Sequence, residues 1–258
     1  MFHLAAWYQS VDPASAYVNL NAVADTQLSV GTSTIQVPTL NQIIALAGGA
    51  ETTVAPRMRL SCPALRNKSL FQLSPLNNAA AGAVSPSDPH KVVDLRDTPL
   101  QMVTSEQLQM QLYSDPAAVQ IQWALIWLAD APPTEIKGPA FTVRATGSTT
   151  LTAGSWTNVA LTFDENLPRG RYQVVGMKAC SAGCIGARVL IPGQTWRPGC
   201  MGNSATQNNE WPGFRYGNLG EYGQFEDIDA ITADFLANSA DTTEIVFFDL
   251  IQLRAGPA

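Results

Sequence analysis

Charged residues are scarce in this chain. Asp, Glu, Lys and Arg make up 14% of the 258 residues, against about 25% in typical soluble proteins. The net charge is -6 and the basic residues are scattered, so no basic run could neutralise a phosphate backbone. We therefore expect no extensive direct binding of nucleic acid. Few charges favour a surface that other copies of the chain cover, although a secreted β protein rich in Ser and Thr would have a similar composition.

Histidine and cysteine are also scarce. The two histidines, His3 and His90, are far apart in the sequence, which argues against a catalytic site with a histidine base. The cysteines are too few for a disulfide framework, and the C-x3-C-x15-C spacing of the last three matches no common zinc site. The four cysteines are Cys62, Cys180, Cys184 and Cys200. We expect reduced structural thiols, no metal and no cofactor.

Long hydrophobic runs and familiar catalytic motifs are missing. No segment reaches the roughly 18 apolar residues of a membrane-spanning helix, and the opening MFHLAAWYQS lacks the basic start of a signal peptide. Nucleophile elbows, P-loops, Rossmann glycine patterns, HExxH helices and EF-hand loops do not occur. We therefore expect a protein that is soluble when made, and we expect neither an enzyme nor catalytic residues.

One acidic cluster stands out in EYGQFEDID. Its four carboxylates are Glu221, Glu226, Asp227 and Asp229. Carboxylates of this kind could bind calcium or act as a glycosidase pair. The more ordinary interpretation is a solvated turn that leads into the next strand, and the sequence leaves both interpretations open.

The pattern of short apolar segments predicts β structure. The segments are rich in β-branched and aromatic residues and are bounded by Gly, Pro, Asn, Asp or Ser, which is typical of sandwiches and barrels. VQIQWALIWL (119–128) alternates at first and is then continuously apolar, which predicts a strand that enters a core covered on both faces. The segments 41–49, 105–115 and 230–241 also fit short helices in the connections.

The chain contains an internal repeat. LIWL at 125–128 matches LIQL at 250–253, an offset of 250 − 125 = 125 residues. LSVGTSTIQV resembles LTAGSWTNVAL at an offset of 151 − 28 = 123. Two further pairs, RMRLSCPA with VGMKACSA and SLFQLSP with ARVLIPG, keep the same order. Four ordered matches indicate two copies of one β domain, in which LIWL should superpose on LIQL.

The repeat predicts the domain organisation. We expect an N-terminal segment at residues 1–16, a first domain at 17–131, a linker at 132–139 and a second domain at 140–258. The linker DAPPTEIKGP is rich in proline, which suits a stiff extended connection.

This tandem of similar β domains, with little charge and no catalytic signature, resembles the double jelly-roll major capsid proteins of small icosahedral, membrane-containing bacteriophages. The resemblance implies an all-β fold of two consecutive jelly rolls and a homotrimer that tiles a virion shell after assembly in the host cytoplasm. It also implies contacts with neighbouring capsomers, with penton or minor capsid proteins, and with an internal membrane where one is present.

The resemblance also implies that the N-terminal segment faces the particle interior. Phe2, Leu4, Trp7 and Tyr8 would suit a bilayer interface, where aromatic rings with a polar edge gather. The alternative is that this segment packs beneath its own or a neighbouring subunit. The net charge of -6 departs from relatives that have a basic inner surface, which leaves attraction to lipid headgroups in doubt.

Two other functions compete with a capsid role. The first is a tandem β-sandwich that binds carbohydrate or acts as an adhesin, for which Trp196 and Trp211, in expected loops, are the candidate exposed contacts. The second is a tandem-cupin enzyme. Cupins need a histidine cluster for their metal, which two distant histidines cannot supply.

Overall fold

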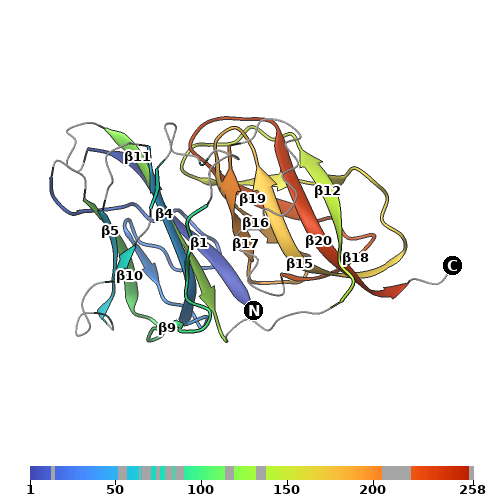
Figure 1. The fold of residues 1–258 in the computed structure, drawn as a ribbon, viewed down its shortest axis with the longest axis horizontal. Helices are drawn as coiled ribbons and strands as arrows, with labels where there is room; N and C mark the ends of the chain where they lie inside the picture. Colours follow the sequence, from blue (N-terminus) through green and yellow to red (C-terminus); the bar gives the residue numbers. More distant parts are fainter. Residues whose placement is uncertain are drawn as a thin grey trace.

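The computed structural model describes most of the chain. The described residues are 1–12, 15–51, 57–63, 65, 71–73, 76–78, 84, 90–113, 119–131, 138–204 and 222–255. They form β-strands and contain no α-helix. The strands build two sandwiches that lie side by side (Figure 1).

The first sandwich takes the strands up to β11. Its strands are β1 (Phe2–Val11), β2 (Val18–Asn19), β3 (Thr34–Gln36), β4 (Gln42–Ala50), β5 (Arg57–Ser61), β6 (Phe71–Leu73), β7 (Asn77–Asn78), β8 (Val93–Asp94), β9 (Leu100–Gln101), β10 (Gln107–Tyr113) and β11 (Gln120–Ala129).

The second sandwich takes the remaining strands. They are β12 (Phe141–Gly147), β13 (Trp156–Ala160), β14 (Thr162–Phe163), β15 (Gly170–Cys180), β16 (Cys184–Leu190), β17 (Gly199–Asn203), β18 (Gly223–Glu226), β19 (Thr232–Ala237) and β20 (Glu244–Ala255).

The strand order is the same in both sandwiches. In the first, one sheet runs β1-β11-β4 with β8 and β9 on β4, and the facing sheet runs β2-β10-β5-β6. In the second, β12-β20-β15-β18 corresponds to the former and β13-β19-β16-β17 to the latter. The chain crosses repeatedly between the two sheets, which is the jelly-roll arrangement. In the second jelly roll, the pairing of β17 with β15 joins the two sheets into one nine-stranded sheet. The chain is therefore an all-β double jelly roll, as predicted.

The two jelly rolls stack as four sheet layers. From left to right in Figure 1 these are the layer of β5 and β10, the layer of β1, β4 and β11, the layer of β16, β17 and β19, and the layer of β12, β15 and β20. The second layer therefore lies between its own partner sheet and the second jelly roll. It must be apolar on both faces.

Strand β11 shows this double burial directly. Residues 122–129 are all buried. Ile126 packs in the core of the first jelly roll, whereas Leu125 points toward β16, so that a Cβ on Gly186 would lie 3.2 Å from its Cδ1. The prediction that VQIQWALIWL enters a core covered on both faces is confirmed.

The predicted superposition of LIWL on LIQL, at an offset of 125, is wrong. The true offset differs from it by an odd number of residues, because Leu125 and Leu250 face opposite sides of their sandwiches. Leu125 faces outward from its own sandwich. Leu250, its expected counterpart, alternates with the outward-facing Phe247 and Asp249 and packs inside the second sandwich. A slip of one residue moves every side chain of a strand to the other face. LIWL and LIQL are therefore alike in composition but face opposite ways.

The helical interpretation of three segments is also wrong. Segments 41–49, 105–115 and 230–241 contain β4, β10 and β19. In β4 the run of apolar residues reflects burial on both faces, because its residues enter two different core clusters. Burial of both faces removes the period of two that normally distinguishes a strand.

The N-terminal segment is not separate from the first jelly roll. It contains β1, which pairs along its whole length with β11, so the first jelly roll begins near residue 2 and not at residue 17. Phe2, Leu4 and Trp7 are buried. Tyr8 is half-buried against Gly154 of the second jelly roll. Phe2, Leu4 and Trp7 are therefore core and junction residues, whereas Tyr8 keeps part of its surface exposed at the junction.

Candidate functional site

The junction between the two jelly rolls is the most elaborate site in the described part of the chain. Outward-facing residues of the β1–β11–β4 sheet join one core cluster with the second jelly roll. They are Phe2, Leu4, Ala6, Ile44, Ala45, Ala47, Trp123, Leu125, Trp127 and Ala129. The jelly rolls therefore share a continuous apolar core, and burial of this size favours one rigid unit.

Backbone contacts fix the alignment of the two jelly rolls. The indole Nε1 of Trp127 donates a hydrogen bond to the Gly199 carbonyl at 2.8 Å. The amide of Leu4 donates to the Arg197 carbonyl at 3.0 Å. Both acceptors belong to the edge formed by β17 and the residues just before it. The first jelly roll thus satisfies polar groups that the apolar contact would otherwise bury unpaired.

Glycines allow this close approach. Gly154 has φ +71°, and a Cβ there would lie 2.5 Å from the Tyr8 ring. A side chain at this position would be strained and would also collide with Tyr8. The turn that contains Gly154 is therefore shaped to receive the first jelly roll.

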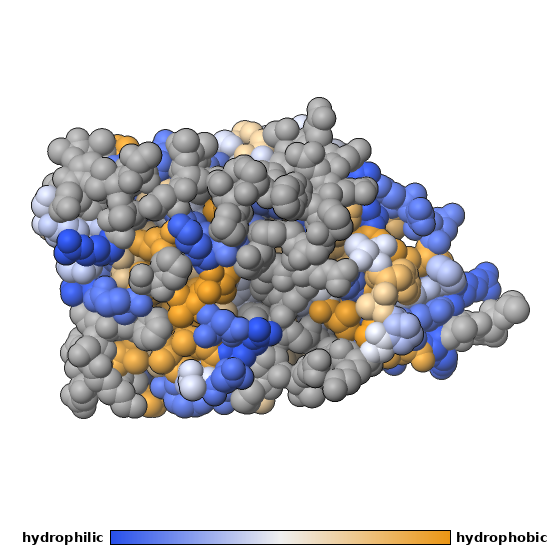
Figure 2. Space-filling view, in the orientation of Figure 1, coloured by the Kyte–Doolittle hydropathy of each residue, from blue (hydrophilic) through white to orange (hydrophobic). Residues whose placement is uncertain are grey.

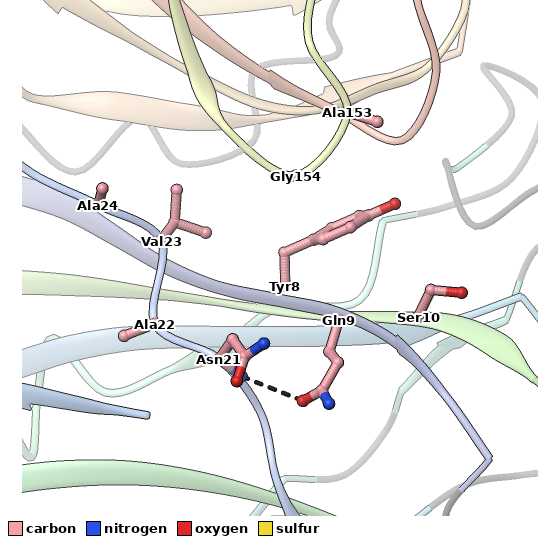
Figure 3. A pocket seen from close by; sticks show the side chains of 9 residues that line it. All are labelled: Tyr8, Gln9, Ser10, Asn21, Ala22, Val23, Ala24, Ala153 and Gly154. Carbon is pink, nitrogen blue, oxygen red and sulfur yellow. Dashed lines mark hydrogen bonds between the residues drawn. The ribbon is translucent and has the colours of Figure 1, made fainter. Parts of the chain in front are cut away.

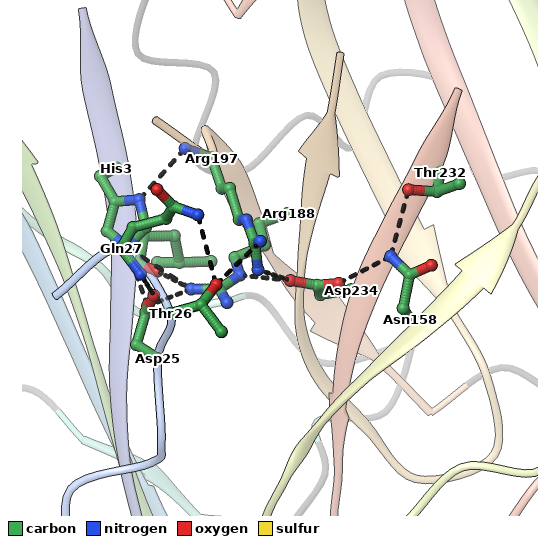
Figure 4. A network of polar contacts seen from close by, with 10 residues as sticks. His3, Asp25, Thr26, Gln27, Asn158, Arg188, Arg197, Thr232 and Asp234 are labelled. Carbon is green, nitrogen blue, oxygen red and sulfur yellow. Dashed lines mark hydrogen bonds and ion pairs between the residues drawn. The ribbon is translucent and has the colours of Figure 1, made fainter. Parts of the chain in front are cut away.

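Arg188 is the centre of a buried ionic network at the junction (Figure 4). Its side chain is 1% exposed. Its Nε donates to Asp234 of β19 at 2.9 Å, and its Nη1 donates to the Leu4 carbonyl at 3.2 Å and to the Asp25 carboxylate. A guanidinium from the second jelly roll therefore pairs with a carboxylate from each jelly roll.

Arg197 and His3 complete the network. Arg197 donates to Asp234 at 2.7 Å and to the Thr26 hydroxyl at 3.0 Å. The amide of Arg197 donates to His3 Nδ1 at 3.1 Å, so the ring proton of neutral His3 lies on Nε2, 2.9 Å from Asp25. Two arginines then face two carboxylates. This balance matters because a buried charge without a partner is strongly destabilising.

The network shifts the pKa values of its acid and its base. Burial lowers the pKa of His3, and the hydrogen bond and charge of Asp25 only partly oppose this effect. Burial alone would raise the pKa of Asp25, but the hydrogen bond from His3 and the charge of Arg188 outweigh it, so this pKa lies well below its usual range. Asp25 is therefore a carboxylate and His3 is neutral near pH 7.

Two hollows border the junction along the segment 21–26. One has a volume of about 380 Å³ and contains Tyr8 beside Ala153 and Gly154 (Figure 3). The other, of about 340 Å³, lies over the network and is lined by Asn158 and Thr232 among others. Some of the polar groups that line them pair with one another, as where Asn158 donates a hydrogen bond to Asp234 at 2.9 Å.

His90 also lies at the junction. It is 5% exposed and lies near Lys178 of β15 and the backbone of Gly202. Burial, assisted by Lys178, lowers its pKa to about 3. Val84, from the same long connection, accepts a hydrogen bond from Ser204 at 2.8 Å. Both histidines of the chain are thus buried residues of the first jelly roll that meet cations of the second.

The cysteines lie inside the jelly rolls. All four are buried free thiols. Burial raises the pKa of Cys180 to about 11 and that of Cys200 to about 12, and it places that of Cys184 well above its ordinary value. Across the described residues, no group of three or more His, Cys, Asp or Glu could hold a metal ion. These thiols are poor nucleophiles and poor metal ligands.

The described part of the acidic cluster stabilises a turn. Asp227 accepts a hydrogen bond from the Gly170 amide and Asp229 from the Glu226 amide, both at 2.8 Å. Glu221 lies outside the described residues. Asp227 and Asp229 therefore stabilise the turn between β18 and β19.

The tryptophans named by the sequence do not form an exposed platform in the described residues. Trp196 packs against the core of the first jelly roll and its ring centroid lies 5.6 Å from that of His3. Trp211 lies outside the described residues. The guanidinium of Arg188 lies 4.3 Å over the ring of Trp156 of β13, so one face of this tryptophan is covered as well.

Sequence reasoning did not find the ionic network. Asp25 and Arg188 are 163 residues apart and come from different jelly rolls, so no local pattern joins them. One signal was available. Arg188 in ARVLI and Asp234 in TADFLA are charges within otherwise apolar strands, and such charges are usually paired.

Comparisons with known proteins do not assign the chain to a family. No family model and no curated protein matches the chain. Among solved structures, the crystal structure of the major capsid protein P2 from Bacteriophage PM2 matches with 15% identity and a TM-score of 0.24, covering 93% of this chain and 98% of that chain. A TM-score this low supports no conclusion, so the fold assignment depends on the strand order itself. No helix in the described part of the chain is long and apolar enough to cross a membrane.

Proposed function

We propose that this protein is the major capsid protein of an icosahedral virus and forms homotrimers that tile the shell. The observation that supports it best is the identical strand order of two jelly rolls stacked face to face in one chain. Three such chains would place six similar domains in one ring. A ring of six similar domains can pack on a hexagonal lattice, although the chain itself is present in only three copies.

The junction supports a structural role. Its apolar contact and buried ion pairs hold the jelly rolls in one orientation, as a building block of a regular shell requires. The surface also suits assembly, since the face in Figure 2 mixes hydrophobic and hydrophilic areas on both jelly rolls. Val103, Val119, Ile228 and Leu253 are large exposed apolar residues, with Ile228 at 87% exposure. Contacts with penton or minor capsid proteins and a location in the virion belong to the same proposal.

A carbohydrate-binding tandem sandwich is the competing function. It would need aromatic rings with a free face, and Trp196, the candidate that the structure describes, packs against the core of the first jelly roll. The structure therefore offers this function no specific support.

The state of assembly tests the proposal. Multi-angle light scattering of the purified full chain should give the mass of a trimer or of a larger assembly. Negative-stain microscopy of the protein from its source should show regular shells. A protein that remains a monomer at high concentration and is absent from particles would overturn the proposal.

A further inference from the structure

A row of four side chains crosses the outer face of the β13–β19–β16 sheet. In this junction row, Asn158 of β13 donates to Asp234 of β19 at 2.9 Å, and Arg188 of β16 donates through Nε to the same carboxylate at 2.9 Å. The guanidinium lies 4.3 Å over the ring of Trp156. The junction row thus consists of a central acceptor, Asp234, that binds an Asn and an Arg, with an aromatic ring beneath the Arg.

The first jelly roll contains the same row on its β2–β10–β5 sheet. In this outer row, Gln111 of β10 donates to Asn19 of β2 at 2.9 Å, and Arg59 of β5 donates through Nε to Gln111 at 2.8 Å. The guanidinium lies 3.6 Å over the ring of Tyr17. Only the central residue differs in kind, because a neutral amide replaces the carboxylate of the junction row.

The strand register shows that the two rows are equivalent positions. In each row, the Asn and the Arg lie directly opposite the same residue of the central strand. The aromatic residue precedes the Asn by two positions in both rows. The offset is 139 for the aromatic residue (156 − 17) and 139 for the Asn (158 − 19).

The two rows differ in what covers them. Arg188 of the junction row reaches Asp25 on the preceding jelly roll and is buried there. Arg59 of the outer row is half-buried. Within the described residues, its one hydrogen bond goes to Gln111 and no carboxylate pairs with it. A guanidinium has five N–H donors, so Arg59 can still bind an incoming carboxylate.

The position of Asp25 identifies its counterpart. Asp25 follows the residues that pair with the outer edge of β1, where Trp7 lies opposite Ala22. Continuing this register places Asp25 opposite Leu4, whose side chain faces out of the sandwich. The acidic residue is therefore attached to the outer edge of the first strand of its jelly roll.

Asp164 occupies the equivalent place in the second jelly roll. It follows β14, which pairs with the outer edge of β12 through Ala145 and Phe163, and its amide donates to the Arg144 carbonyl at 3.0 Å. Its offset from Asp25 is 164 − 25 = 139, as for the two rows. Asp164 is exposed and pairs with Arg144 at 2.5 Å, much as Asp25 pairs with His3 while it also binds Arg188.

We propose that a second copy of the chain docks its second jelly roll on the outer row, so that Asp164 of one copy pairs with Arg59 of the next. This contact repeats the junction inside each chain, and it rests on the proposed function. It joins two different surfaces, so it is heterologous and generates a ring when the rotation closes. Three chains give a ring of six jelly rolls with the same kind of contact at every junction.

Cross-linking tests the contact without removing the ion pair. Asn19→Cys places a thiol in the outer row, on the other side of Gln111 from Arg59, and Glu165→Cys places one beside Asp164. The native thiols are buried, so a short bis-maleimide should react mainly at the new sites. The double variant should give covalent dimers and trimers, and a mixture of the two single variants should give dimers. Each single variant alone should give neither, and Asp97→Cys combined with Glu165→Cys is the exposed off-face control.

A charge variant tests the pair itself. Asp164→Asn should weaken trimer formation roughly tenfold or more, because Arg59 loses its carboxylate. The matched control Glu165→Gln removes the neighbouring charge and should leave trimer formation nearly unchanged. Equal effects of the two variants would overturn the pair.

The outcomes separate this contact from the capsid proposal. Trimers in light scattering without cross-links in the double variant would overturn the contact and leave the capsid function standing. Cross-linking of a single variant with itself would show an isologous dimer and would also overturn the contact. A protein that is monomeric throughout would overturn both proposals.

Discussion

The junction row and the outer row occupy equivalent positions in the two jelly rolls, but only the junction row is covered by another domain of the same chain. Inside the chain the row is covered, its arginine is 1% exposed, and its central residue is the carboxylate Asp234. On the outside the arginine is half-buried and the central residue is the neutral Gln111. A permanently buried guanidinium needs charge balance from the folded chain itself. An accessible guanidinium does not need a carboxylate in its own chain, because a partner can supply it.

We expect the largest effect from replacing the arginine of each row in turn, because only Arg188 is permanently buried with charged partners. Arg188→Met leaves Asp25 and Asp234 with fewer partners in a buried site, and we expect it to lower the free energy of unfolding by about 3–5 kcal/mol. Arg59→Met, the matched change in the outer row, should cost the single chain about 0–1 kcal/mol. Urea denaturation at low protein concentration measures both. Equal losses would contradict the contrast between the rows.

Two glycines with left-handed backbone provide a smaller contrast. Gly154 (φ +71°) faces Tyr8 across the junction, whereas a Cβ added at Gly193 (φ +77°) would meet nothing within 4 Å. Gly193→Ala should cost about 1–2 kcal/mol from backbone strain alone. Gly154→Ala adds a collision and should cost about 1–3 kcal/mol more. Thermal unfolding of the two variants measures the difference. Equal stabilities of Gly154→Ala and Gly193→Ala would mean that the turn at Gly154 is not in close contact with Tyr8.

Acid should also weaken the junction, through its two buried histidines. Both histidines have folded pKa values below 6.5, with that of His90 about 3. The unfolded chain therefore takes up protons first, and stability is lost as the pH falls below about 6.5. The lowered pKa of Asp25 adds a loss that begins only near its ordinary value of about 3.8 and below.

Urea midpoints at about pH 7.5 and about pH 5 measure this loss. His90→Asn should flatten the dependence relative to the unchanged chain, since it removes one of the two groups. An unchanged slope in this variant would show that His90 does not titrate between the folded and unfolded states.

The sequence predicted the fold class because the strands carry strong local signals. VQIQWALIWL was correctly expected to enter a core covered on both faces. The same double burial misled three other predictions. It made β4 resemble a helix, it made β1 resemble a membrane-facing segment, and it concealed whether Leu125 or Leu250 points inward. Composition does not distinguish the two faces when both are apolar.

The site could not be predicted because it depends on contacts between the jelly rolls. Asp25, Arg188 and Asp234 meet only after both sandwiches have formed and stacked. The equivalence of Asn19 with Asn158 was equally hidden, since its offset of 139 differs from the offsets of 125 and 123 at which the apolar segments resemble each other. Polar pairs across neighbouring strands reveal the repeat more accurately than the apolar strands do.

Cryo-electron microscopy of the assembled protein tests the central claim most directly. The claim is that the contact between the two jelly rolls inside each chain recurs between chains. The account predicts a ring of three chains in which the carboxylate of Asp164 lies within hydrogen-bonding distance of Arg59 of the next copy, with the outer row buried. An assembly in which the outer row faces solvent or meets a different surface would contradict it.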